Sequence, residues 1–109
     1  MFDTIRYEIQ SGVAWIILNR PDTLNAFVQQ MNTEGTKALK HAEKDDAVRA
    51  IVLTGEGRAF CSGQDLSDIA DEDDYAVILR ERYNPMISTL AVLEKPVIAA
   101  VNGTAAGAG

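Results

Sequence analysis

The sequence has few of the residues that build disulfide bridges, metal sites and nucleic-acid interfaces. Its 109 residues include one cysteine and one histidine, and 16 Asp and Glu outnumber 10 Lys and Arg. A single cysteine excludes an intrachain disulfide. The formal net charge of −6 argues against a nucleic-acid partner, because such binding depends on cationic side chains that neutralise phosphates.

Long hydrophobic runs are also missing. The longest run covers residues 13–18, far short of the roughly 20 residues that cross a bilayer as a helix. The first ten residues, MFDTIRYEIQ, lack the apolar stretch of a signal peptide. We therefore expect a cytoplasmic protein that makes no membrane contact. Its 47% hydrophobic and 24% charged residues are typical of one globular domain.

What the sequence does contain is an alternation of strand and helix patterns. Strand patterns occupy residues 4–10, 13–18, 50–54 and 96–101, and helical patterns occupy residues 28–44 and 75–93. The first two strands flank Ser11-Gly12, which predicts a β-hairpin. The strand–helix–strand order that follows ends in a continuous apolar run, which predicts a parallel crossover in a buried sheet. Pro85 is expected to kink or split the second helix.

Two loops rich in small residues each follow a buried strand, at residues 59–66 and 103–109. Ligands of open α/β sheets bind beyond the carboxyl ends of the strands. Glycine lets a backbone N–H approach a ligand closely. Two such groups would form an oxyanion hole for the charge that develops on a carbonyl oxygen. Glycines that only form tight turns would produce the same pattern, so both interpretations are compatible with the residues.

Several other polar residues have simpler explanations than catalysis. Asp65 is expected to cap a helix that begins at Leu66, and the positive end of that helix would lie near an enolate oxygen. Cys61 has no cue for thiolate activation and His41 lies on an amphipathic helix, so we expect a buried cysteine and a surface histidine. A solvated acidic segment, and not a cation site, is expected from Asp68, Asp71, Glu72, Asp73 and Asp74, whose spacing does not match a calcium loop.

Three motifs resemble those of the crotonase (enoyl-CoA hydratase/isomerase) family. They are Asn19-Arg20-Pro21 followed by Leu24-Asn25-Ala26, the stretch FCSGQDL at residues 60–66, and KPVIAAVNG at residues 95–103 running into AGAG at residues 106–109. Their order and spacing over residues 19–109 are those of the family. The resemblance implies the α/β crotonase (ClpP/crotonase-like) spiral of repeated β-β-α units. It also implies that residues 1–109 are the N-terminal portion of a single crotonase-like domain, so that the spiral is incomplete in this chain.

The resemblance further implies enolate chemistry on an acyl-CoA thioester. Gln64-Asp65-Leu66, with the residues RYNP at 82–85, is most similar to the 1,2-epoxyphenylacetyl-CoA isomerases of phenylacetate catabolism, which convert ring-1,2-epoxyphenylacetyl-CoA into an oxepin-CoA. By position, the two backbone oxyanion donors are Gln64 and Ala108. Contacts with coenzyme A, made largely through the backbone, are implied for Asn25, Ala26, Ala59, Ser62, Asp65 and Leu66.

The resemblance implies no metal ion or redox cofactor, because coenzyme A is part of the substrate. It also implies a homotrimer or hexamer, the usual assembly of family members. The family's acid and base carboxylates lie after the second loop, so Glu34, Asp46 and Asp68 are not assigned that role. Two alternatives stay open. One is a truncated, non-catalytic acyl-CoA-binding or remnant protein. The other is a dinucleotide-binding domain, because Gly107-Ala108-Gly109 is compatible with the start of a G-x-G-x-x-G fingerprint.

Overall fold

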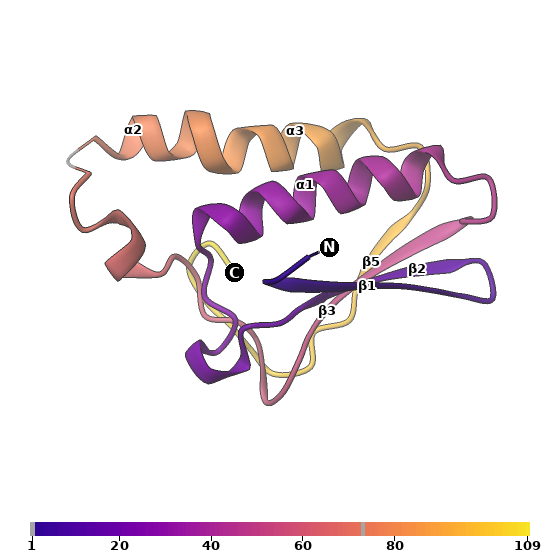
Figure 1. Cartoon of the computed structure of the whole chain (residues 1–109), viewed down its shortest axis with the longest axis horizontal. Coiled ribbons are helices and arrows are strands. Elements are labelled where there is room, and N and C mark those ends of the chain that lie inside the picture. The colour runs from indigo at the N-terminus through magenta and orange to yellow at the C-terminus, as the bar shows by residue number, and fades with distance from the viewer. Residues whose placement is uncertain (1, 73) are drawn as a thin grey trace.

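The computed structural model describes residues 2–72 and 74–109 and has two layers, with helices covering one face of a sheet (Figure 1). Met1 and Asp73, the second of which belongs to the expected acidic segment, lie outside the described residues. The main sheet has the order β1-β2-β3-β5, and its strands are β1 (Ile5–Gln10), β2 (Val13–Leu18), β3 (Ala50–Gly55) and β5 (Val97–Ala99). A second sheet pairs β4 (Ala59–Cys61) with β6 (Thr104–Ala105).

The predicted hairpin and the predicted crossover are both confirmed. β1 and β2 pair antiparallel across the turn at Ser11 and Gly12, where φ is +53° and +81°. Positive φ at both turn residues matches the right-handed twist of the strands that they join. β2 and β3 pair in parallel, and α1 (Gln29–Lys44) connects them. The element order then repeats strand, strand, helix, as predicted, with β3 and β4 followed by a second group of helices.

The core lies between α1 and the inner face of the sheet. The buried side of α1 carries Met31, Ala38, Leu39 and Ala42, spaced for one helical stripe. Ile16 of β2 and Ile51 of β3 oppose them and are almost fully buried. This packing sets the position of the strand ends from which the candidate site is built.

The second helical segment is irregular next to Pro85, as predicted, but it is not split in two there. It consists of α2 (Tyr75–Ile78), the π-helical turn η3 (Leu79–Tyr83) and α3 (Asn84–Val92). Proline lacks an N–H and clashes with the carbonyl one turn earlier. The wider turn just before Pro85 relieves that conflict, since the Asn84 N–H bonds the Leu79 carbonyl five residues back. No helix in the described residues is both long enough and apolar enough to cross a membrane.

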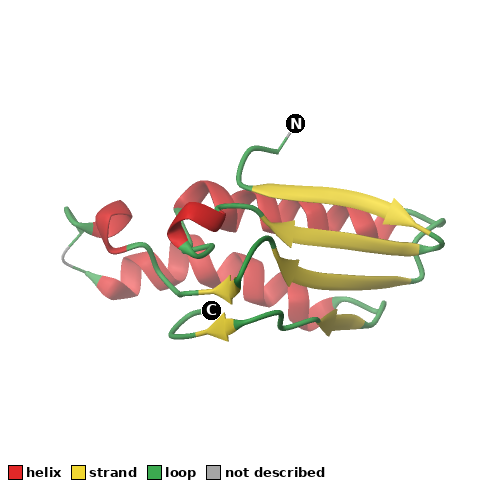
Figure 2. Cartoon of the chain, turned by 90° about the horizontal axis from the view of Figure 1, so that it is seen from below, coloured by secondary structure: helices red, strands yellow, loops and turns green. Residues whose placement is uncertain are grey.

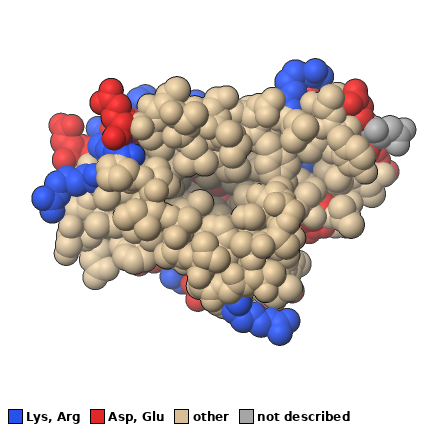
Figure 3. Space-filling model, turned by 180° about the vertical axis from the view of Figure 1, so that it is seen from behind, with Lys and Arg blue, Asp and Glu red and all other residues tan. Residues whose placement is uncertain are grey.

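The predicted burial of the last strand is also wrong. Ile98 of β5 is 54% exposed, and Val101, just beyond the strand, is 56% exposed. Helices cover only one face of the sheet, and the other face lies open when seen from below (Figure 2). Figure 3 shows a broad uncharged face of the molecule with its charged side chains at the rim. An apolar run predicts a buried strand only where another layer covers it.

A buried carboxylate fastens the N-terminal segment to α1. Glu34 accepts hydrogen bonds from the Thr4 hydroxyl at 2.6 Å, the Thr4 N–H at 2.8 Å, the Asp3 N–H at 3.1 Å and Gln30 Nε2 at 3.0 Å. Burial opposes the ionisation of Glu34, but these hydrogen bonds outweigh it and lower the pKa of the carboxyl below its ordinary value. Because the folded pKa lies below the unfolded one, the contribution to stability is present above the unfolded value of 4.5 and is lost as the pH falls through the folded pKa.

Replacing Glu34 with glutamine is therefore expected to lower the free energy of unfolding by about 2 kcal/mol at neutral pH. The variant should also lose less stability than the unmodified chain when the pH falls below 4.5. Urea unfolding at a series of pH values measures both effects. Glu81→Gln, at an exposed position on η3, is the control and should change neither quantity. Parallel pH profiles for Glu34→Gln and the unmodified chain would contradict this account.

Candidate functional site

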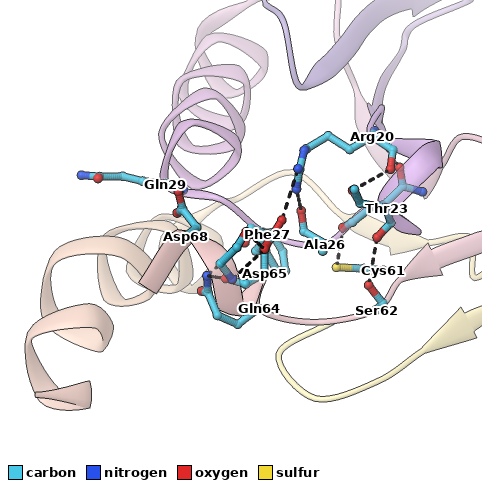
Figure 4. Close-up of polar contacts among 12 residues, drawn as sticks. Arg20, Thr23, Ala26, Phe27, Gln29, Cys61, Ser62, Gln64, Asp65 and Asp68 are labelled. Atoms are coloured by element: carbon cyan, nitrogen blue, oxygen red, sulfur yellow. Dashed lines mark hydrogen bonds and ion pairs between the residues drawn. The ribbon is translucent and has the colours of Figure 1, made fainter. Parts of the chain in front are cut away.

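The motif segments that are separated in the sequence meet beyond the carboxyl ends of the parallel strands. Arg20 joins two of them, because its Nη1 donates to the Ala26 carbonyl at 2.6 Å and its Nη2 contacts the Asp65 carboxylate at 3.2 Å (Figure 4). The loops after β3 and β5 leave the sheet at the same end (Figure 2). The two small-residue loops are thus brought together, as the parallel arrangement predicts.

Two asparagine side chains hold the start of the first loop, at Ala59. Asn25, with a φ of +58°, accepts from the Arg20 N–H at 2.8 Å and donates to the carbonyls of Glu56 and Ala59 at 3.0 Å each. Asn102 also donates to the Ala59 carbonyl, at 3.1 Å. The start of β4 is therefore held by one asparagine from each neighbouring motif.

The segment 61–65 runs between two other segments like the middle strand of a small parallel sheet. On one side, the Ser62 N–H bonds the Leu24 carbonyl at 3.0 Å and the Phe27 N–H bonds the Gly63 carbonyl at 2.7 Å. On the other side, the Ala106 N–H bonds the Cys61 carbonyl at 3.0 Å, continuing the pairing of β4 with β6. Gly63, with a φ of +103°, interrupts the regular alternation of peptide groups, so that its carbonyl points to the side opposite the Cys61 carbonyl.

This arrangement sets the direction of the Gln64 N–H. The chain has no cis peptide bond among its described residues, so the N–H of Gln64 points opposite to the carbonyl of Gly63 in the same planar group. That carbonyl points toward Phe27. The Gln64 N–H therefore points away from Phe27, toward the side on which residues 106–108 lie.

Gly63 is one point of close approach between the two loops. A methyl group added to it would lie 2.9 Å from the Ala106 oxygen and 3.4 Å from the Ala108 nitrogen, and its φ is +103°. Within residues 2–72 and 74–109, the main-chain N–H groups of Gln64 and Ala108 donate no hydrogen bond, whereas those of Asp65 and Gly109 do. The two expected donors thus come from adjoining loops and are unused.

An apolar cavity of about 270 Å³ opens between the helices and the sheet. Its wall includes Phe27, Phe60 and Ala108, together with residues of α1 and α3. Gln64 does not line it. The cavity is therefore not the gap that the sequence predicts between the two amides, and we place no acyl group in it.

The residues expected to contact coenzyme A fall into two groups. Ser62 and Asp65 are partly exposed and Leu66 is 75% exposed, so these three lie on the surface of the first loop. Asn25, Ala26 and Ala59 are buried, with exposures of 0%, 8% and 3%. Their polar groups make hydrogen bonds within the loop region, and the contact of all six residues with coenzyme A stays a prediction.

Asp65 caps the segment that follows it, as expected, but that segment is not an α-helix. Its carboxylate accepts from the Ser67 N–H at 3.0 Å at the start of η2 (Leu66–Ile69), a single 3₁₀ turn. The prediction that the positive end of a helix lies near the enolate oxygen is therefore wrong, because a segment this short has little helix dipole. Hydrogen bonds from Ser67, together with Arg20, lower the pKa of Asp65, which keeps the carboxyl ionised at neutral pH.

The predictions of a buried Cys61 and a surface His41 are confirmed. Cys61 is fully buried and burial raises the pKa of its thiol. His41 is exposed and lies edge-on to the Tyr7 ring. No group of three potential metal ligands is found among the residues that the structure describes. Asp68 departs from the expectation of a solvated acidic segment, because its carboxylate accepts from the Gln29 N–H at 2.9 Å and pairs with Arg82 at 2.7 Å.

Sequence reasoning missed one residue of the site. Tyr83 donates its hydroxyl to the Gln64 side chain, and no pattern in the sequence points to this contact. The only available signal was the position of Tyr83 two residues before Pro85, in the stretch similar to one group of isomerases.

Comparison with known proteins gives one consistent family. The enoyl-CoA hydratase/isomerase family matches residues 8–109. The 1,2-epoxyphenylacetyl-CoA isomerase of Escherichia coli K12 is 44% identical over 114 residues, and a "Probable enoyl-CoA hydratase" of Rhodobacter capsulatus is 52% identical over 109 residues. These matches cover 100% and 99% of this chain but 44% and 42% of the relatives, so the chain spans less than half the length of either relative.

Solved structures show the same architecture. A protein of Pseudomonas aeruginosa has a TM-score of 0.87 at 36% identity, over 97% of this chain and 47% of its own. An enoyl-CoA hydratase/isomerase from Xanthobacter autotrophicus has a TM-score of 0.85 at 37% identity, over 94% of this chain and 40% of its own. The α/β spiral predicted from the motifs is thereby confirmed for the part that this chain contains.

Proposed function

The chain belongs to the enoyl-CoA hydratase/isomerase family, and from this premise we propose that its protein binds acyl-CoA thioesters and stabilises their enolates between the main-chain N–H groups of Gln64 and Ala108. The observation that carries the proposal is that the Gly63 carbonyl accepts from the Phe27 N–H, so that the Gln64 N–H points the other way, toward the loop of Ala108. Among the residues that the structure describes, this N–H has no hydrogen-bond partner. The alternative of a dinucleotide-binding domain is not supported by the family match.

The chemistry follows from where the negative charge develops. Removing a proton next to a thioester carbonyl, or adding a nucleophile to an enoyl thioester, moves charge onto the carbonyl oxygen. Two fixed N–H donors stabilise that charge without reorganising, and each donor contributes about 3 kcal/mol to the transition state. The residues that move the proton are not proposed from this chain.

Coenzyme A is expected to lie along the exposed side of the first loop. Ser62 and Leu66 offer surface there, and Asp65 is held rigidly by Arg20 and Ser67. No metal ion or redox cofactor is part of the proposal. Trimeric or hexameric assembly and a cytoplasmic location are proposed from the family resemblance alone, as is the assignment of residues 1–109 to the N-terminal portion of a single crotonase-like domain.

Within the family, we propose 1,2-epoxyphenylacetyl-CoA as the substrate. The support is the 44% identity to the Escherichia coli isomerase of that name and the Gln64-Asp65-Leu66 sequence of the first loop. The alternative of a non-catalytic acyl-CoA-binding or remnant protein differs in one respect, which is that it predicts binding without turnover.

A spectrophotometric screen of the product of the gene that encodes this sequence tests the proposal. Ring-1,2-epoxyphenylacetyl-CoA and short-chain enoyl-CoA thioesters should be compared at equal concentrations. We expect turnover of the epoxide to exceed that of the enoyl thioesters by about 10-fold or more in kcat/KM, which is about 1.4 kcal/mol of discrimination. Saturable binding of both substrates without turnover would favour the non-catalytic alternative, and turnover of the enoyl thioesters alone would overturn the choice of substrate.

A further inference from the structure

The proposed mechanism leaves one buried polar side chain beside the amide pair without a role. Tyr83, the last residue of η3, is 8% exposed and donates its hydroxyl to Gln64 Oε1 at 2.5 Å. We propose that Tyr83 is a positioning residue that holds Gln64 so that its main-chain N–H is aimed at the thioester oxygen. This inference rests on the proposed function.

The Gln64 side chain is held at every polar atom. Its Oε1 accepts from Tyr83, and its Nε2 donates to the carbonyls of Phe27 at 3.1 Å and Asp65 at 2.9 Å. A glutamine side chain has several rotatable bonds, and three hydrogen bonds select one conformation from them. The Gln64 side chain therefore links its own loop to Phe27 on one side and to Tyr83 on the other.

Phe27 completes a closed set of contacts. Its N–H and carbonyl bond the Gly63 carbonyl at 2.7 Å and the Asp65 N–H at 2.8 Å, one residue before and one residue after Gln64. The Tyr83 ring packs edge-on against the Phe27 ring, with centroids 5.5 Å apart and an interplanar angle of 83°. Tyr83 thus touches both the side chain of Gln64 and the residue that orients its peptide group.

The local fold explains why Tyr83 reaches the loop. Tyr83 is the last residue of the π-helical turn before Pro85, and the wider turn places it differently on the helix surface than an α-helical turn would. Arg82, the preceding residue, pairs at 2.7 Å with Asp68 of η2, the turn that follows the first loop. Burial, more than the nearby Cys61, raises the pKa of Tyr83 to about 12, so the hydroxyl remains a donor at neutral pH.

Tyr83→Phe tests the role in the product of the encoding gene, because it keeps the ring against Phe27 and removes only the hydroxyl. We expect kcat with the best acyl-CoA of the screen to fall about 10-fold, with KM changed by less than about twofold. Tyr75→Phe, at an exposed tyrosine of α2, is the matched control and should behave like the unmodified protein. In a Gln64→Leu background, Tyr83→Phe should have no further effect. An unchanged kcat, or an equal further loss in that background, would overturn the inference.

A second measurement separates this inference from the proposed function. In ¹⁵N-labelled protein, Tyr83→Phe should shift the main-chain and side-chain amide signals of Gln64 and speed hydrogen exchange at the Asp65 N–H, whereas Tyr75→Phe should not. Unchanged signals would overturn the positioning role even in an active enzyme. If the unmodified protein turns over no acyl-CoA, the proposed function fails, and these signals still decide whether Tyr83 orders the loop.

Discussion

Replacing Gly63 with alanine is expected to lower kcat/KM toward acyl-CoA substrates by about 100-fold or more. The added methyl group would meet the Ala106 oxygen at 2.9 Å and lie 3.4 Å from the Ala108 nitrogen. The first of these contacts is too short and is with a backbone atom, and alanine is strained at the Gly63 φ of +103°. We therefore expect the two loops to move apart, so that the two N–H groups can no longer reach one oxygen. A loss of one donor alone accounts for about 3 kcal/mol of transition-state stabilisation.

The control for this variant is a glycine with similar backbone strain outside the site. Gly57 has a φ of +83°, and a methyl group there would lie 3.2 Å from Pro21 Cβ, not against either loop of the amide pair. Gly57→Ala should therefore lose some stability but keep kcat/KM within about threefold of the unmodified protein, since an alanine at positive φ costs only about 1–2 kcal/mol of folding free energy. Equal losses of activity in folded Gly57→Ala and Gly63→Ala proteins would remove the support for the site.

Replacing Asn25 with alanine is expected to cost at least about 3 kcal/mol of the free energy of unfolding. Three hydrogen bonds of the buried amide are lost, leaving the Arg20 N–H and the Glu56 carbonyl without their partner. The φ of +58° adds to this cost, because asparagine adopts that conformation more readily than alanine does. Urea denaturation, followed by circular dichroism, measures the change.

Asn102→Ala is the matched comparison because it removes an amide with as many contacts at an exposed position, where water can replace them. Asn102 donates to the carbonyls of Ala59 at 3.1 Å and Gly57 at 3.0 Å and accepts from the Gly55 N–H at 3.1 Å. The substitution should cost about 1 kcal/mol alone. In the double variant the costs should not add, because both side chains serve one acceptor. Asn25→Gly, which removes the backbone strain, should remain less stable than the unmodified chain. An Asn25→Ala chain as stable as Asn102→Ala would contradict the structural role given to this motif.

Local patterns were sufficient to predict the elements that pair with close neighbours in sequence. The hairpin followed from alternation and from Ser11-Gly12, and α1 followed from its apolar stripe. The burial of β5 could not be predicted in this way, since Ile98 is apolar but no described element covers it. The π-helical turn was missed because proline signals a disturbed helix without showing how the helix accommodates it.

In the candidate site too, the residues named by the motifs were predicted, whereas the contacts between distant residues were not. Gln64 and Ala108 were expected from the motifs, and the structure places their loops side by side. The contacts of Arg20 with Asp65 and of Tyr83 with Gln64 join residues 45 and 19 positions apart. Such pairs depend on how helices and loops pack, and no periodicity in one sequence contains that information. For the same reason the sequence gives no sign that the Asn25 side chain is buried and bonds the carbonyls of Glu56 and Ala59.

The most direct test of the amide pair is an NMR titration of the ¹⁵N-labelled protein with butyryl-CoA, a thioester that cannot undergo hydration, against free coenzyme A. We predict that butyryl-CoA moves the main-chain N–H signals of Gln64 and Ala108 downfield along one saturation curve, and that free coenzyme A moves signals near Ser62 and Leu66 but leaves those two in place. Saturation by butyryl-CoA with either of the two signals unmoved would contradict a thioester oxygen held between them.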